Sequence, residues 1–147
     1  MRPVYIFDLD GTLSNAEHRV HHLEGETKDW DAFYAACGDD APIVSTIRTM
    51  RNLMAAGCEV WVWTGRRADQ VHTTIDWLTA HAKMPQTLRM RPDGDWTPDT
   101  DLKRRWLEEL PAEQRERIVA VFEDRKSVVD MWRAQGLTCY QVAPGEF

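Results

Sequence analysis

The chain has 147 residues, of which 43% are hydrophobic and 29% are charged. These proportions are typical of a soluble globular protein, and the length suits a single domain with a substantial core. The net charge of −6 excludes a protein whose whole surface attracts polyanions, so any nucleic-acid contact would need a local basic cluster.

Two further features predict a cytoplasmic protein with no membrane partner. No apolar run approaches the roughly 18 residues that span a bilayer, and the N-terminus does not resemble a signal peptide. The three cysteines, Cys37, Cys58 and Cys139, are widely spaced and odd in number. We interpret them as reduced thiols.

Apolar runs alternate with stretches of helical period along most of the chain. The predicted strands cover residues 4–7, 58–63, 87–90, 118–122 and 138–142. The predicted helices cover residues 43–56, 68–82, 101–110 and 126–135. This alternation is typical of βαβ units, so we expect an α/β fold built on a parallel sheet of about five strands.

The first predicted strand ends at two aspartates, Asp8 and Asp10, followed by a Gly11-Thr12 turn. Residues two apart share a face of an extended chain. Two close carboxylates are costly unless a cation or a shared proton offsets them, so the pair indicates a divalent metal, an acid/base couple or both. Such a pair can carry phosphoryl transfer through an aspartyl-phosphate. The alternative is a strand end with an Asx turn.

About 50 residues separate the first two predicted strands, more than one crossover helix needs. We expect the surplus, residues 14–40 (the insertion), to form a small helical lid over the aspartate pair. It contains three histidines, His18, His21 and His22. Their spacing lacks a matching set of zinc ligands, so surface or substrate contacts are the preferred interpretation. It also contains three aromatic residues, Trp30, Phe33 and Tyr34, which either stack on a base or pack within the lid.

Polar residues also follow the next segments of the chain. The second predicted strand ends at Thr64-Gly65-Arg66, where a hydroxyl, backbone N–H groups and a guanidinium suit an oxyanion, although a simple turn is an alternative. Lys103 lies near a helix start, where the macrodipole disfavours a cation. It is therefore either directed at a phosphate or solvated on the surface.

The fourth predicted strand ends at Glu123-Asp124. The Asp124 carboxylate could complete a Mg²⁺ site with Asp8 and the backbone carbonyl of Asp10, because Mg²⁺ takes oxygen ligands. In open α/β sheets, sites form beyond the carboxyl ends of the strands, and all of these groups are expected there.

In this order, Asp8-Leu9-Asp10-Gly11-Thr12, Thr64, Lys103 and Glu123-Asp124 resemble the four motifs of the haloacid dehalogenase (HAD) superfamily of phosphohydrolases. The resemblance implies a Rossmann-like three-layer sandwich with the first strand at its centre. It also implies that Asp8 is the nucleophile, that Asp10 is the general acid/base, and that Thr64 and Lys103 bind the phosphoryl oxygens. Mg²⁺ would be bound by Asp8, Asp10 and Asp124.

A narrower resemblance rests on Thr64-Gly65-Arg66, on the spacing from Asp99 to Lys103, and on residues 122–125. These are similar to the 3′-phosphatase domain of bacteriophage-type polynucleotide kinase/phosphatase. The resemblance implies that Arg19, Gly65 and Arg66 bind the substrate. It further implies that Asp99 positions Lys103 and that Glu123, where that branch has Asp, lies behind the metal ligands. The kinase phosphate loop is missing, so a separate polynucleotide kinase or ligase is an expected partner.

We therefore interpret the chain as a Mg²⁺-dependent phosphomonoesterase that acts through an aspartyl-phosphate. The expected substrate is a phosphorylated nucleic-acid end or a nucleotide, above all a polynucleotide 3′-phosphate. Arg19, Arg89 and Arg91 are the basic groups expected to meet it. Three alternatives remain: a nucleoside monophosphate or small-metabolite phosphatase, a phosphoacceptor signalling domain, and a catalytically idle end-binding module.

Overall fold

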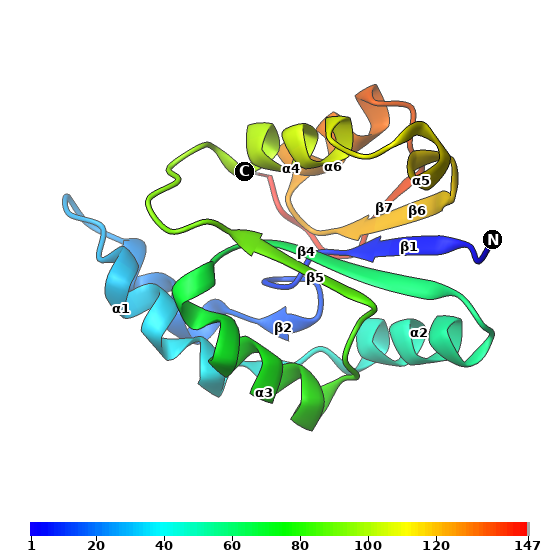
Figure 1. Cartoon of the computed structure of the whole chain (residues 1–147). Coiled ribbons are helices and arrows are strands. Elements are labelled where there is room, and N and C mark those ends of the chain that lie inside the picture. Colours follow the sequence, from blue (N-terminus) through cyan, green and yellow to red (C-terminus); the bar gives the residue numbers. More distant parts are fainter. Residues whose placement is uncertain (147) are drawn as a thin grey trace.

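A parallel five-stranded sheet lies between two layers of helices in the computed structural model, which describes residues 1–146 (Figure 1). The strands are β1 (Val4–Phe7), β4 (Glu59–Arg67), β5 (Thr87–Arg91), β6 (Ile118–Glu123) and β7 (Cys139–Gln141). Their order is β5-β4-β1-β6-β7, so β1 is central and pairs with both β4 and β6. This is the Rossmann-like α/β architecture that the sequence predicts.

Helices cover both faces of the sheet. The two on one face are α2 (Val44–Ala55) and α3 (Val71–His81), and the three on the other are α4 (Asp99–Glu108), α5 (Ala112–Glu116) and α6 (Lys126–Ala134) (Figure 1). The α6 helix buries the apolar stripe predicted from its sequence: Val128, Val129, Met131 and Trp132. A sheet that is covered on both faces needs apolar residues on both sides of each strand, which explains the nearly continuous apolar runs.

Most of the tryptophans belong to the core, as expected. The Trp61 and Trp63 rings lie on one face of β4 with their centroids 6.0 Å apart. Trp63 also meets the edge of Trp106 from α4 and the ring of Trp132 from α6. This cluster fixes α4 and α6 against the sheet, and therefore fixes the residues at the start of α4.

Two element boundaries differ from those predicted. The β4 strand continues through Thr64 to Arg67 instead of ending in a turn, and its pairing with β5 shifts register between Thr64 and Arg67. The α4 helix begins at Asp99, because Pro98 precedes it with an extended backbone and acidic residues occupy its first turn. Lys103 consequently lies one turn inside the helix, on the same side as Asp99.

The insertion contains β2 (Ser14–Asn15), the 3₁₀-helix η1 (Glu17–Leu23), α1 (Trp30–Ala35) and the 3₁₀-helix η2 (Ala36–Asp39). The β2 strand pairs antiparallel with β3 (Ala41–Pro42), which closes the neck of the insertion. The 3₁₀-helix η2, which follows α1, packs against α3. Within residues 1–146, no helix combines the length and the apolar character needed to cross a bilayer.

Candidate active site

Asp8 follows β1 at the centre of the sheet and is buried. Lys103 Nζ donates to Asp8 Oδ1 at 2.8 Å and to Glu123 Oε2 at 2.9 Å. It also lies 3.7 Å from Asp99 Oδ2. Only 1% of the lysine is exposed, so Lys103 is a buried cation among carboxylates and not a solvated surface residue. This agrees with the predicted alignment of Asp99 with Lys103.

Asp8, Glu123 and Asp124 form a compact acidic cluster. Each offers one carboxylate oxygen, and these three atoms lie within 4.8 Å of one another. Burial and the neighbouring Glu123 raise the pKa of Asp8 well above its ordinary value. Burial and the charge of Asp8 raise the pKa of Asp124 to about 7. The cluster therefore carries more negative charge than Lys103 can offset, and its oxygen donors are of the kind that a hard divalent cation binds.

Glu123 takes a more direct part than the sequence indicated. It was expected behind the metal ligands, but Oε2 bonds to Lys103 and a carboxylate oxygen is part of the acidic cluster. The Asp10 side chain does not join this cluster among the residues that the structure describes. Any metal contact from Asp10 would use its backbone carbonyl, as the sequence suggested.

The glycines of the first two motifs allow close approach between loops. Gly11 has a φ of +83°, and a Cβ at that position would collide with the Asp124 carboxylate. A Cβ at Gly65 would collide with the Asp99 carboxylate. Thr12 Oγ1 donates to Asp124 Oδ1 at 3.3 Å. The Gly11-Thr12 turn therefore supports the acidic group that ends the fourth motif.

Asp10 occupies a different environment only two residues from Asp8. Arg19 Nη2 donates to Asp10 Oδ1 at 2.7 Å, and Arg66 Nη2 donates to the same oxygen. Burial by itself would raise the pKa of Asp10, but the charges of Arg66 and Arg19 outweigh it and lower the pKa to about 2. Asp10 is therefore a firmly ionised carboxylate in this arrangement.

Asp40, a residue that the sequence analysis missed, completes this second cluster. Its buried carboxylate accepts from Arg19 Nε at 2.8 Å and from Arg19 Nη2 at 2.7 Å, with Arg66 Nη2 at 3.4 Å. His18 Nε2 lies 2.7 Å from Asp40 Oδ1, while the rings of His21 and His22 contact each other. The sequence signal for Asp40 is weak, because it is one of two adjacent aspartates where the insertion returns to the sheet.

The two arginines are thus surrounded by protein groups. Both are nearly fully buried, and Arg66 Nη1 also donates to Thr74 Oγ1 at 3.0 Å. Thr64 is buried beside them, and its hydroxyl accepts from the backbone N–H of Arg66 at 3.1 Å. The structure therefore brings Arg19 and Arg66 together on the Asp10 carboxylate, with Thr64 next to Arg66.

The predicted basic pair beside the third strand makes contacts within the protein. Arg91 Nε donates to the Gly65 carbonyl at 2.8 Å, and Nη2 donates to Asp99 Oδ1 at 3.1 Å. Arg89 pairs with Glu109 and lies over the rings of Trp63 and Trp106. These arginines support the site and its surroundings, so the expectation that they meet nucleic acid finds no support in their contacts.

The chain also matches a known family of phosphatase domains. A family described as "Polynucleotide kinase PNKP phosphatase domain" matches residues 2–147. The chain belongs to this family. It is a HAD-type phosphatase domain, as the ordered motifs predicted.

Solved structures agree with this assignment. A chain in "Structure of Pnkp1/Rnl/Hen1 complex" is 28% identical with a TM-score of 0.79, and one in "Structure of the Pnkp1/Rnl/Hen1 RNA repair complex" is 27% identical with a TM-score of 0.82. Each match covers 99% of this phosphatase domain but only 48% and 44% of those chains. The domain therefore spans about half the length of these relatives.

More distant matches share the fold alone. The class C acid phosphatase from Bacillus anthracis with tungstate bound is 20% identical, with a TM-score of 0.68 over 99% of this chain and 67% of that chain. CbbY from Rhodobacter sphaeroides in complex with phosphate is 17% identical, with a TM-score of 0.65 over 100% of this chain and 88% of that one.

Proposed function

We propose that this phosphatase domain removes the 3′-phosphate from a nucleic-acid end, in a Mg²⁺-dependent reaction that passes through an aspartyl-phosphate on Asp8. One observation carries the proposal. Asp8 lies between Lys103 and an acidic cluster, whereas Asp10, two residues away, is bound by two arginines. Two neighbouring carboxyl groups that are held by different partners can take different chemical roles.

Asp8, Asp124 and Glu123 would hold the Mg²⁺ ion, together with the Asp10 backbone carbonyl. The donor set fits, because it consists of oxygens, is largely buried and carries excess negative charge. When bound, the cation supplies positive charge that keeps the carboxylates ionised and offsets the charge of the phosphoryl group.

In the first step, an Asp8 carboxylate oxygen attacks phosphorus, and the bond from phosphorus to the ester oxygen breaks as the new bond forms. Asp10 gives a proton to the departing alkoxide. In the second step, Asp10 takes a proton from a water molecule, which attacks the phosphorus and releases inorganic phosphate and free Asp8. Lys103 and the Thr64 hydroxyl stabilise charge on the transferring group.

The low pKa of Asp10 suits the second step directly, since the group is a carboxylate. The first step requires it to carry a proton, so its contacts with Arg19 and Arg66 must weaken. A bound phosphoryl group that shares the two guanidinium groups would have this effect. On this proposal the arginines bind substrate and set the protonation of Asp10 with the same N–H groups.

The relatives support the choice of substrate and of partners. The matching structures are titled as Pnkp1/Rnl/Hen1 complexes, and one title describes an RNA repair complex. We infer that this domain likewise acts on nucleic-acid ends, alongside a polynucleotide kinase or a ligase.

A substrate panel tests the proposal. It compares 3′- and 5′-phosphorylated oligonucleotides, mononucleotides and p-nitrophenyl phosphate, with Mg²⁺ or EDTA. We expect the 3′-phosphorylated oligonucleotide to have the highest kcat/KM, with an advantage that shrinks as salt rises, at a slope of roughly 0.7 per phosphate contact. EDTA should abolish turnover, and Asp8→Asn should lower kcat by several orders of magnitude.

Two results would contradict the proposal. A salt-independent preference for a small sugar phosphate would indicate a metabolite phosphatase. A phosphorylated protein that survives for minutes or longer would indicate a signalling domain.

A further inference from the structure

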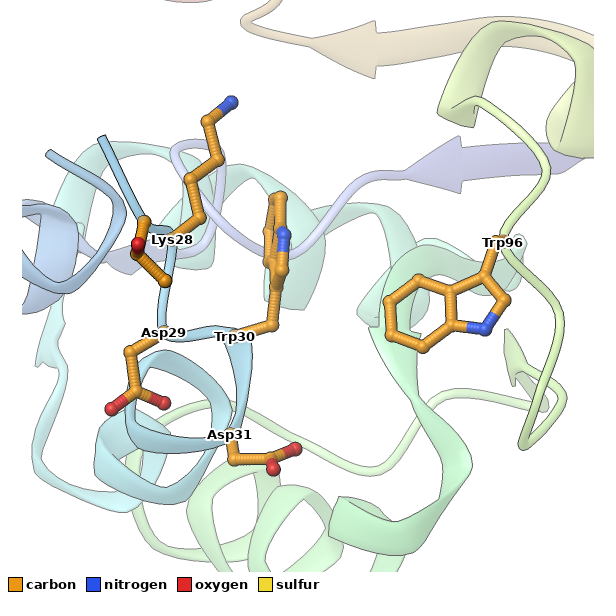
Figure 2. Close-up of a pocket in the computed structure, with 6 residues that line it drawn as sticks. Lys28, Asp29, Trp30, Asp31 and Trp96 are labelled. Atoms are coloured by element: carbon orange, nitrogen blue, oxygen red, sulfur yellow. The ribbon is translucent and has the colours of Figure 1, made fainter. Parts of the chain in front are cut away.

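A hollow of about 380 Å³ opens between the insertion and the loop that joins β5 to α4 (Figure 2). Residues 27–31 line one side, and Trp96 lines the other. Trp30 and Trp96 project into it from opposite sides (Figure 2). The volume falls within the roughly 300–1,000 Å³ typical of ligand sites. None of the proposed catalytic residues lines it.

The exposure of Trp96 is unusual for this protein. It is 72% exposed, whereas Trp61, Trp63, Trp77, Trp106 and Trp132 are all buried. Arg91 Nη1 donates to the carbonyls of Asp95 and Thr97, at 3.1 and 2.5 Å, so it fixes the backbone on either side of Trp96. A half-buried arginine that binds the backbone on both sides of an exposed indole holds that indole toward solvent.

Trp30 is supported in a comparable way at the start of α1. Its ring stacks on Tyr34 with centroids 5.9 Å apart and meets the edge of Phe33. Asp29 caps the helix by accepting from the Ala32 N–H at 3.0 Å. The predicted packing of these aromatic residues within the lid is therefore correct for Phe33 and Tyr34, while Trp30 packs on them and also lines the hollow.

Both sides of the hollow are anchored to one atom of the catalytic region. Tyr34, which supports Trp30, donates from its hydroxyl to the Gly65 carbonyl at 3.4 Å. Arg91, which supports Trp96, donates to the same carbonyl at 2.8 Å. Gly65 lies between Thr64 and Arg66, the residues proposed to meet the phosphoryl group. The hollow is thus adjacent to the phosphate site and connected to it by two side chains.

The charged residues around the hollow favour a ligand that has an uncharged ring next to a phosphate group. Asp31 pairs with Arg67 at 2.6 Å, and Asp29 is used as the helix cap. Lys28 Nζ lies 5.9 Å from the centre of the Trp30 ring and, within residues 1–146, forms no ion pair. The carboxylates of Asp29 and Asp31 therefore already bind protein groups, and the Lys28 ammonium group can contact a ligand.

We propose that this hollow binds a nucleobase of the substrate strand, stacked against Trp30 and Trp96, with Lys28 close to the strand's backbone. The inference rests on the proposed function, because it places a base of the same strand whose terminal phosphate reacts at Asp8. Aromatic stacking accepts every base, so the site selects for a polynucleotide end without selecting for sequence.

The test uses a set of 3′-phosphorylated single-stranded oligonucleotides in which one of the last four nucleotides is abasic. Stacking on an aromatic side chain is worth on the order of tenfold in affinity per base. For the wild-type protein, we expect one abasic position to raise KM by roughly that factor. Trp96→Ala should raise KM on the intact strand by a similar factor and remove most of the penalty for the abasic site.

Two further variants make the result specific. Trp96→Tyr retains an aromatic face and should restore most of the preference for the base. Met84→Ala removes an exposed apolar side chain from the loop before β5, at the opposite end of that strand from Trp96, and should leave both KM values unchanged. An equal effect of Trp96→Ala on intact and abasic strands, or no abasic penalty at any position, would overturn the inference.

A binding measurement separates this inference from the proposed function. An unphosphorylated single strand, which cannot turn over, should quench the tryptophan fluorescence of the wild-type protein and quench it much less in Trp96→Ala. If quenching occurs but 3′-phosphatase activity is absent, the base site stands and the proposed function fails. If 3′-phosphatase activity is present without quenching or an abasic penalty, the base site is contradicted and the proposed function stands.

Discussion

The environments of Asp8 and Asp10 differ more than two positions in sequence would suggest. Around Asp8, the carboxylates of Asp8, Asp99 and Glu123 share one lysine, and Asp124 adds a further carboxylate to the acidic cluster. Around Asp10, two carboxylates are matched by two arginines, one from the insertion and one from β4. The first cluster has an excess of negative charge and the second does not.

On the proposed mechanism, this difference gives Asp8 and Asp10 different roles. The cluster at Asp8 is stable in ionised form only with an added cation, which couples the nucleophile to a metal. The cluster at Asp10 needs no cation and keeps that group ionised by itself. Residues two apart would share a face of an extended chain, so side-chain alternation does not explain this difference. What surrounds each aspartate comes from distant parts of the chain.

The variant Asp10→Asn should have the largest effect, and it tests the different roles proposed for Asp8 and Asp10. The amide cannot accept a proton from water, so the second half-reaction should slow by roughly 10²- to 10⁴-fold. With p-nitrophenyl phosphate the first half-reaction should survive in part, because p-nitrophenolate departs with little protonation. We expect a burst of p-nitrophenolate approaching one per site, with hydroxylamine-labile phosphate on Asp8.

A different outcome would reassign Asp10. If burst and steady-state rate fell together and no phosphate were trapped, Asp10 would be a structural group. Glu123 or a histidine of the insertion would then be the next candidate for the base.

The variant Asp40→Asn tests the same difference by changing the charge around Asp10 while Asp10 itself is kept. Without the Asp40 charge, the arginines act on Asp10 alone, so its pKa should fall further and proton donation should weaken. We expect kcat to fall about tenfold for an alkoxide leaving group and much less for p-nitrophenyl phosphate. The loss of a buried partner should also lower the free energy of unfolding by about 3 kcal/mol.

The neighbouring Asp39→Asn is a matched control, because Asp39 is exposed and makes no contact with the two arginines. It should change neither the rate nor the stability. If Asp40→Asn lowered both reactions equally, Asp40 would support the fold without setting the protonation of Asp10.

The smallest effect is on the pH dependence of stability, where the two clusters should act in opposite directions. The pKa of Asp10 is lowered from 3.8 to about 2, so its ion pairs stabilise the fold above pH 4 and this contribution, about 2 kcal/mol, is lost as the pH falls toward 2. The pKa of Asp124 is raised to about 7, so its ionisation should destabilise the metal-free fold increasingly from pH 4 to 7.

Urea unfolding between pH 2 and 8, with EDTA or Mg²⁺, measures both contributions. Mg²⁺ should remove the loss above pH 4, and Asp124→Asn should reduce it without Mg²⁺, although the raised pKa of Asp8 still contributes. A metal-free protein whose stability rose from pH 4 to 7 would contradict the assignment of Asp124.

The strand pattern was sufficient to predict most of this site. Asp8 and Asp124 were expected together because groups beyond the carboxyl ends of parallel strands meet at one edge of the sheet, whereas Lys103 was assigned to the site through the resemblance to the HAD motifs. That rule depends only on the order of strands and helices, which the apolar periodicity reveals. It could not show that Lys103 lies a full turn inside α4, since that depends on where the helix begins.

Other features lay beyond sequence reasoning because they depend on tertiary contacts. Asp40 is brought to the arginines by the pairing of β2 with β3, and strands of two residues leave no periodic signal. Thr64-Gly65-Arg66 was predicted as a turn, yet it continues β4 beside β5. Arg89 and Arg91 resemble surface cations in the sequence, but their long side chains reach Glu109 and Gly65.

The contribution of Arg19 and Asp40 from the insertion has a consequence for how such enzymes diversify. A cap that only covers a site can be exchanged for another, and substrate choice then changes while the chemistry persists. Here the same segment supplies Arg19, one of the two arginines that keep Asp10, the proposed acid/base residue, ionised. A grafted cap would have to bring its own arginine and counter-ion in register with Asp10, so new substrates are more accessible through changes in residues 24–31 than through replacement of the whole segment.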